Sequence, residues 1–274
     1  MFSEFITPGV PAAIFWTFVA LAVVIQGISK SGFAGGAGIL SLPLMMLVMP
    51  VQLVSATLLP LLILCDMNAV YHHFHNKVWA KVMEIYLPSL IGIVAGAAVW
   101  WWIGREGVEA YAGPIKRFVG VIAILFGLYI VGKESALQWI ERVKPGRKSA
   151  VVAGVAAGFT STIAHAAGPI VSLYLFAQDL GKSLFVGTVA WTFTLINLTK
   201  LPFYCSVGLI HKDVLLFDLV LIPLIPIGSY LGKWMYHRVS ERLFNRVVMV
   251  LTLIAGVQLL LNVNLILWAL ELVV

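Results

Sequence analysis

The sequence has few charged residues. Asp, Glu, Lys and Arg make up 11% of its 274 residues, whereas hydrophobic residues make up 61%. A water-soluble globule needs more polar surface than this to cover its core. The shortage of charge therefore excludes a soluble globular domain. It predicts that most of the chain lies in lipid, where a helix needs about 20 apolar residues to cross the membrane.

Cysteine is scarce, and the common catalytic motifs are missing. The two cysteines, Cys65 and Cys205, lie in apolar segments without C-x-x-C spacing, which favours buried free thiols over a redox or metal framework. No G-x-S-x-G, H-E-x-x-H or P-loop motif is present. We therefore expect neither an enzyme nor a resident metal or cofactor. The net charge of +6 reflects basic residues between apolar segments, so we expect it to set topology rather than to bind nucleic acid.

Ten apolar segments follow one another along the chain. They lie near residues 11–30, 35–50, 53–75, 80–104, 113–132, 149–163, 164–178, 184–208, 212–235 and 243–270. The most polar stretch, residues 133–148, divides them into two sets of five. We predict an all-α integral membrane protein with 8 to 10 membrane helices, some of them short, broken or re-entrant. Its parts would be a first membrane repeat at 1–132, a cytoplasmic linker at 133–148 and a second membrane repeat at 149–274.

Short motifs recur at matching places in the two sets. Ser31-Gly32-Phe33-Ala34 corresponds to Ala157-Gly158-Phe159-Thr160, and Gly38-Ile39-Leu40-Ser41 corresponds to residues 168–172 with one residue inserted. Thr57 and Thr188 then stand 19 and 20 residues beyond Gly38 and Gly168, and nine residues after each threonine stands a polar side chain, Asp66 or Asn197. This order indicates an internal duplication.

The basic residues indicate how the two sets cross the membrane. Because five segments is an odd number, the second set enters from the opposite side, which is an inverted repeat. With the linker inside, thirteen of the eighteen Lys and Arg residues, Lys30 among them, lie in inside loops, as expected for cytoplasmic loops. Residues 149–178 are too few for two full crossings, so we expect this pair to be short or re-entrant around a cavity.

Two turns rich in small residues form the first candidate binding site. Each precedes an apolar helix, whose N-terminus presents unpaired N–H groups and about half a positive charge. Two such turns that meet at the membrane midplane from opposite sides would bind a small anion. Close helix packing is the alternative role of such residues. The candidates are Ser31, Gly35, Gly36 and Gly38 in the first turn and Thr160, Ser161, Thr162, His165 and Gly168 in the second.

Ionisable and amide side chains inside the spans form the second candidate set. The set consists of Asp66, Asn68, Asn197 and Lys200. A charge at the bilayer centre costs about 2.5–3.5 kcal/mol on insertion scales, so it faces a partner or a pathway. Lys200 lies one helical turn after Asn197 and either supplies positive charge to an anion or pairs with Asp66.

Three threonines and one histidine complete the candidates. The hydroxyls of Thr57, Thr188 and Thr192 either line the same cavity or bond back to their own helices. The reference pKa of histidine, about 6.5, suits His165 to proton handling or to an anion contact, and a hydrogen-bonded structural role is the alternative. We take Asp66 and His165 as the candidate residues for ion coupling.

A separate histidine cluster suggests a different function. His72, His73 and His75 stand beside Trp79 at the cytoplasmic end of a span, where such side chains anchor the interface. No carboxylate or cysteine stands nearby at metal-ligand spacing. A membrane enzyme or assembly factor that uses this cluster is the main alternative to anion transport, and a passive anion channel is another.

The motifs together resemble one membrane protein family. The turn leading into Gly38-Ile39-Leu40-Ser41-Leu42-Pro43, its echo at Gly168-Pro169-Ile170-Val171, and the pairs Ala56-Thr57 and Gly187-Thr188 resemble the sulfite exporter TauE/SafE family over nearly the entire chain. The resemblance implies a multi-pass transporter of the bacterial or archaeal inner (cytoplasmic) membrane. It would export sulfite, an organosulfonate or a related sulfur-containing or carboxylate anion by alternating access, driven by an ion gradient.

One departure from the family pattern concerns His165. Ala164-His165-Ala166-Ala167 stands where such proteins often have a run of glycines, which suggests that a side-chain contact replaces a backbone contact. The expected partners are a small anion, membrane lipid and a coupling ion, either proton or sodium. The sequence leaves open the exact substrate, the direction of transport, the oligomeric state, for which a homo-oligomer is one alternative, and whether segments 35–50 and 164–178 cross the membrane fully.

Overall fold

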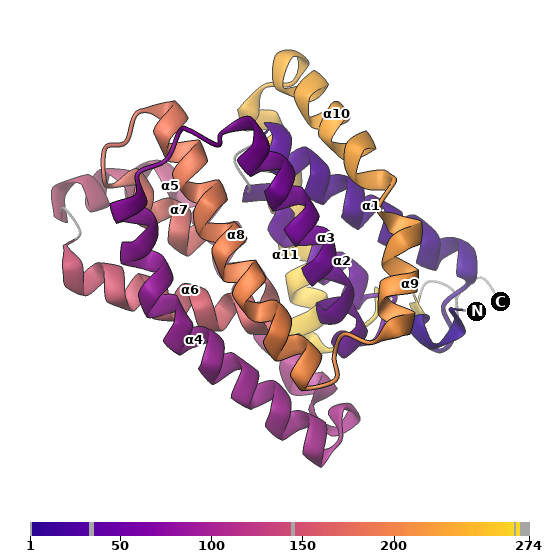
Figure 1. Cartoon of the computed structure of the whole chain (residues 1–274). Coiled ribbons are helices and arrows are strands. Elements are labelled where there is room, and N and C mark those ends of the chain that lie inside the picture. Colours follow the sequence, from indigo (N-terminus) through magenta and orange to yellow (C-terminus); the bar gives the residue numbers. More distant parts are fainter. Residues whose placement is uncertain (1, 33–35, 144–145, 266, 269–274) are drawn as a thin grey trace.

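The computed structural model is a bundle of packed helices and describes residues 2–32, 36–143, 146–265 and 267–268 (Figure 1). No strand occurs in these ranges. The elements in chain order are η1 (Ser3–Phe5), α1 (Ala12–Gly32), η2 (Gly36–Leu40), α2 (Ser41–Met46), α3 (Val51–His72), α4 (Trp79–Glu106), α5 (Val108–Val143), α6 (Arg147–Ala164), α7 (Gly168–Phe176), α8 (Lys182–Ser206), α9 (Lys212–Leu221), α10 (Leu224–Arg238) and α11 (Glu241–Leu261).

Five of these helices are long and apolar enough to cross a membrane. They are α1, α3, α4, α8 and the Val108–Tyr129 part of α5. A sixth crossing is formed if α9 and α10, which are bent by 41° at a short break, count as one span. The prediction of an all-helical membrane protein is confirmed, whereas the number of 8 to 10 membrane helices stays a prediction.

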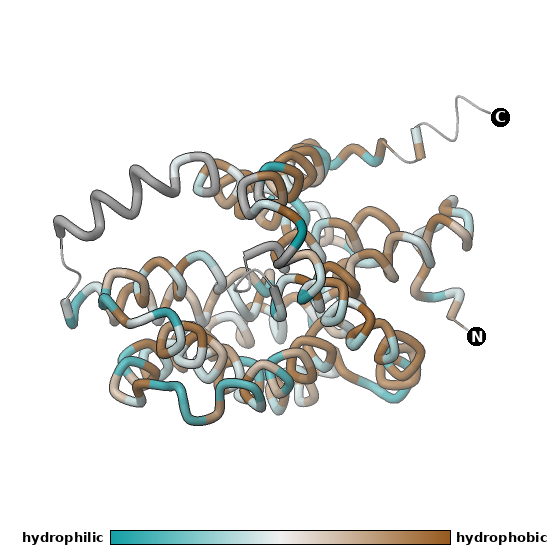
Figure 2. Tube along the Cα trace, turned by 90° about the horizontal axis from the view of Figure 1, so that it is seen from above, coloured by the Kyte–Doolittle hydropathy of each residue, from teal (hydrophilic) through white to brown (hydrophobic). Residues whose placement is uncertain are grey.

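The outer surface is apolar, as a protein in lipid requires. Leu87, Ile91 and Val94 on α4 and Leu125 and Leu128 on α5 are all more than half exposed. Hydrophobic residues dominate the helices, and hydrophilic residues gather mainly in the turns (Figure 2). In water such a surface would aggregate, so these side chains are suited to contact with lipid tails.

Two predicted segments are short helices. The described residues of segment 35–50 form η2 and α2, which together run from residue 36 to 46, and segment 164–178 contains α7, which has nine residues. At 1.5 Å per residue, neither reaches across a hydrocarbon layer of about 30 Å. The α2 residues are all buried, so this half-length helix lies inside the protein.

Two details of the predicted boundaries change. The polar stretch 133–148 is helical up to Val143, because α5 continues beyond its apolar part. Lys30, which we assigned to an inside loop, belongs to the last turn of α1, and its side chain is only 14% exposed. The apolar stretch ends near Lys30, but the helix continues to Gly32, and this explains the misplacement.

The main packing contacts join helices from the two predicted repeats. α1 packs against α10, α4 against α6, α5 against α11, and α3 against α8 through the middle of the molecule (Figure 1). Small residues permit the close crossings: a Cβ at Gly158 in α6 would meet the backbone of Ser89 in α4, and one at Gly232 in α10 would meet the backbone of Ile28 in α1. The two pairs thus use the same kind of contact.

Candidate functional site

The break between α6 and α7 is shaped by an unusual residue at its turn. His165 closes α6 in the left-handed conformation, with φ 49° and ψ 30°, and its amide donates to the Ser161 carbonyl at 3.0 Å. Glycine is the usual residue in this position, because a side chain there costs roughly 1–2 kcal/mol. α7 then begins at Gly168 with no side-chain cap, which leaves its first N–H groups without intrahelical partners.

A small cavity lies between the start of α7 and η2, the short helix in the other predicted repeat. Its lining residues are Gln26, Lys30, Gly38, Ile39, Leu62, Ser161, His165, Ala166, Ala167, Gly168, Pro169, Phe193 and Asn197. The space that the centres of water molecules can occupy is about 40 Å³, enough for a few waters or one small anion. The described parts of the two turns, at Gly38 and at residues 165–168, therefore meet at one small space.

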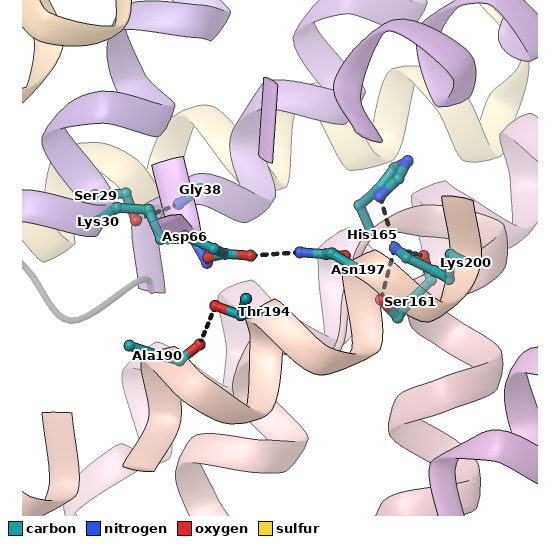
Figure 3. A network of polar contacts seen from close by, with 10 residues as sticks. All are labelled: Ser29, Lys30, Gly38, Asp66, Ser161, His165, Ala190, Thr194, Asn197 and Lys200. Carbon is teal, nitrogen blue, oxygen red and sulfur yellow. Dashed lines mark hydrogen bonds and ion pairs between the residues drawn. The ribbon is translucent and has the colours of Figure 1, made fainter. Parts of the chain in front are cut away.

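An acidic side chain links three helices beside this cavity. Asp66 in α3 is fully buried and accepts from Lys30 Nζ in α1 at 2.5 Å and from Asn197 Nδ2 in α8 at 2.6 Å (Figure 3). The Lys30 ammonium also lies 4.4 Å from the centroid of the Phe193 ring, within the range of a cation–π interaction. Lys30 thus lines the cavity, and Asp66, which does not line it, forms an ion pair with Lys30.

A second polar group surrounds Lys200, which is fully buried in α8. Its Nζ donates to the Ser161 carbonyl at 3.1 Å, to Ser161 Oγ at 2.9 Å and to His165 Nδ1 at 3.1 Å (Figure 3). An ammonium has three N–H groups, so all of its donors are used. The other ring nitrogen, His165 Nε2, faces the Ser55 carbonyl at 3.0 Å. Both contacts are satisfied by a neutral imidazole that carries its proton on Nε2.

The charges around the cavity do not cancel. In their ordinary ionised forms, Lys30 and Lys200 each contribute one positive charge and Asp66 contributes one negative charge, and His165 is neutral in the tautomer assigned above. Within the described part of the chain, Lys200 forms no ion pair and bonds only to neutral acceptors. A buried uncompensated charge is costly. The site as a whole is therefore suited to an anion that supplies the missing negative charge.

The structure brings together part of the predicted site. Gly38, Ser161, His165, Gly168 and Asn197 line the cavity, and Asp66 and Lys200 lie one hydrogen bond behind them. The alternative that Lys200 pairs with Asp66 does not hold, since Asp66 is paired with Lys30. Gly36 begins η2, two residues before Gly38, and is not part of the cavity lining, whereas Gly35 lies outside the described residues.

The remaining predicted hydroxyls lie elsewhere. Thr160 and Thr162 bond back to the carbonyls of Ala156 and Gly158, both at 2.8 Å, and Thr192 bonds to the Thr188 carbonyl at 2.7 Å. Thr188 Oγ1 accepts from the Val78 amide at 3.0 Å. Ser31 and Thr57 have buried hydroxyl oxygens without a partner in the described chain, and neither lines the cavity.

Several residues at the cavity are not among the candidates predicted from the sequence. Gln26, Lys30 and Phe193 line the cavity, and Ser29 Oγ accepts from the Gly38 amide at 2.8 Å, which fixes the turn into η2. Gln26 and Lys30 are four residues apart, so they share one helix face. Two polar side chains on one face at the end of an apolar helix are a signal that could have identified them.

The histidine cluster lies outside this site. His73 follows the last residue of α3, and its pKa is lowered by burial and then by the neighbouring His72. Among the described residues, no group of three or more His, Cys, Asp or Glu side chains is arranged to hold a metal ion. Among the described residues, no hydrogen bond joins this cluster to a residue that lines the cavity.

Comparison with known protein families gives one match. The family described as Sulfite exporter TauE/SafE matches residues 19–259, a range that includes both turns at the cavity. No curated protein and no solved structure matches the chain.

Proposed function

The chain belongs to the sulfite exporter TauE/SafE family, and from this we propose that it is a secondary transporter that exports a small anion across the cytoplasmic membrane. The proposed substrates are sulfite, an organosulfonate or a related sulfur-containing or carboxylate anion. One observation carries the proposal: a small cavity between two helix starts, which has two lysine side chains and, among the described residues, one carboxylate around it.

Lys30 is the proposed direct ligand of the anion. It lines the cavity, and its bond to Asp66 uses only one of its three N–H groups. The N–H groups at the start of α7, which has no side-chain cap, supply further donors at a helix N-terminus. An oxyanion with three oxygens would then bridge Lys30 and the start of α7.

Lys200 is a positioning residue in this proposal. All three of its donors are used, and two of its acceptors belong to Ser161 and His165, which line the cavity. It therefore acts on the anion through its charge and by holding these two side chains in place. In a buried site such a charge is screened far less than at a water-exposed surface.

The packing of the helices supports alternating access. α1 pairs with α10 and α6 pairs with α4, so each predicted repeat packs its first helix against the fourth segment of the other. This reciprocal pairing is what an inverted repeat would produce. We propose that the two halves rock about the crossing of α3 and α8, and open the cavity to one side at a time.

The test is anion binding to purified protein, measured by thermal stabilisation. A ligand that binds only the folded state raises stability by RT ln(1 + [L]/Kd). Sulfite, methanesulfonate, sulfate and acetate would be compared, and we expect a shift for sulfite or the sulfonate. Lys30→Gln should weaken binding by roughly 10- to 100-fold, because a hydrogen bond to a charged group contributes about 1.5–3 kcal/mol.

Lys212→Gln is the matched control, since Lys212 is an exposed lysine at the start of α9. It should bind the anion as the wild type does. If no anion stabilises the protein, or if both variants lose binding equally, the proposed site is wrong. Uphill movement of the anion in vesicles then distinguishes a transporter from a passive channel.

A further inference from the structure

Asp218 is a buried carboxylate that the anion site does not use. Its side chain lies in α9 and the residue is 2% exposed. Neither carboxylate oxygen has a hydrogen-bond partner among the described residues. Burying an ionised carboxylate without hydrogen bonds is strongly unfavourable, whereas a neutral carboxylic acid is tolerated. Intramembrane acids of this kind mark proton pathways in many pumps and transporters.

Asp218 lies on the side of α9 that faces the protein interior. Val214, Phe217, Asp218 and Leu221 are all buried and follow the spacing of one helix face. Leu219 and Val220, on the opposite side, are each more than half exposed. An acid therefore occupies a place in an inward stripe that is otherwise apolar.

The surroundings of this stripe offer Asp218 no countercharge. α9 packs against α3. The ring of Phe217 in α9 also contacts three other rings: Phe2, which precedes η1, Phe5 in η1 and Phe15 in α1. The titratable groups of these elements are Cys65, Asp66, Tyr71 and His72 in α3, Glu4 in η1, Lys30 in α1, and Lys212 and Asp213 in α9. None of them forms a hydrogen bond or ion pair with Asp218 in the described chain.

Asp218 also lies at the bend between α9 and α10. Its carbonyl accepts from the Ile222 amide at 2.9 Å, the last bond of α9 before the 41° change of direction. α9 packs on α3, which carries Asp66, and α10 packs on α1, which carries Lys30. The bend thus joins the two segments that pack against the helices carrying Asp66 and Lys30.

We propose that Asp218 binds and releases the proton that couples anion movement to the proton gradient, a role that rests on the transporter function proposed above. The carboxylate takes up one proton to become a neutral acid when its surroundings are closed, and returns it when the bend exposes it to water. A proton needs only one oxygen, whereas sodium, a hard cation, needs several oxygen ligands together. A single carboxylate among apolar side chains is therefore suited to bind a proton rather than a sodium ion.

The experiment uses the full protein in proteoliposomes and two assays of radiolabelled sulfite. Counterflow at equal pH on both sides measures anion binding and exchange, and accumulation under an imposed pH gradient measures coupling. We expect Asp218→Asn, which mimics the neutral acid, to keep counterflow and to lose the pH-driven accumulation. Asp213→Asn, the same change at an exposed position of the same helix, should keep both.

The outcomes separate the two proposals. If the wild type shows no counterflow, the transporter function fails. If Asp218→Asn still accumulates sulfite under a pH gradient, or if a sodium gradient alone drives the wild type, the role of Asp218 is wrong. Because sulfite itself binds protons, the comparison between wild type and variant decides. If Asp218→Asn loses both assays, Asp218→Glu, which restores a protonatable group, must recover both; recovery of counterflow alone overturns the proposal.

Discussion

Asn197 Nδ2 donates to Asp66 Oδ2 at 2.6 Å and so joins α8 to α3 by a charge-assisted hydrogen bond in the interior of the protein. The two residues stand nine positions after Thr188 and Thr57, at matching places in the two halves. Because Asp66 also pairs with Lys30, one carboxylate holds together α1, α3 and α8. The proposed rocking of the two predicted repeats therefore has to break this bond or move α3 and α8 together.

The first prediction concerns the stability that this network provides. Asn197→Ala should lower the free energy of unfolding by about 1.5–3 kcal/mol, the contribution of a hydrogen bond to a charged group. Asp66→Ala should cost more, about 3–5 kcal/mol, because Lys30 is left without its counter-charge. Thermal unfolding of the purified variants measures both. Asp213→Ala, at an exposed position, is the control, and equal effects at positions 66 and 213 would contradict the network.

The second prediction concerns the charge of the site. Asp66→Asn keeps the size of the side chain and removes one negative charge, so the excess positive charge rises by one. Anion affinity should then rise by roughly tenfold, since opposite charges attract strongly in a buried site. The increase should be larger for sulfate, a dianion, than for methanesulfonate, a monoanion. Titration by thermal stabilisation measures both, and lower affinity for both anions would argue against an electrostatic role of Asp66.

The general class of fold could be predicted from the sequence because apolar length is a local property. The low charge and the apolar segments indicate membrane helices, and the recurrence of Gly38 and Gly168 marks the two turns that meet at the cavity. The half-length of α2 and α7 could not be read in this way, because hydropathy does not show where a helix stops inside an apolar stretch.

The pairing of side chains was harder to predict. Lys200 and Asp66 are both intramembrane charges, and the sequence left open whether they pair. The structure shows that Asp66 instead meets Lys30, which is 36 residues away on α1. Such a choice depends on how the helices cross, which is set by small residues such as Gly27 and Gly228 and by the tertiary packing.

The third prediction tests the close crossing of α4 and α6. A Cβ at Gly158 would overlap the Ser89 backbone, which cannot move aside as a flexible side chain can. Gly158→Ala should therefore destabilise the protein by about 1–3 kcal/mol through overpacking. Gly113→Ala is the matched control, because nothing lies within 4 Å of its Cβ position in α5. Unfolding midpoints that do not differ between the two variants would show that the helices are farther apart.

The fourth prediction concerns the left-handed turn at His165. His165→Ala loses the contacts to Lys200 and Ser55 and keeps a side chain in the unfavourable conformation. His165→Gly loses the same contacts but relieves the backbone, so it should be more stable than the alanine variant by roughly 1 kcal/mol.

The same pair of variants separates backbone strain from anion binding. Both should bind the anion more weakly than the wild type, and to the same extent, because each removes the acceptor that helps to hold Lys200 beside the cavity. Thermal unfolding with and without sulfite measures the two effects in one experiment. If the alanine variant is as stable as the glycine variant, residue 165 does not adopt the left-handed conformation. If the two variants differ in affinity, the turn acts on the anion through its backbone rather than through the histidine side chain.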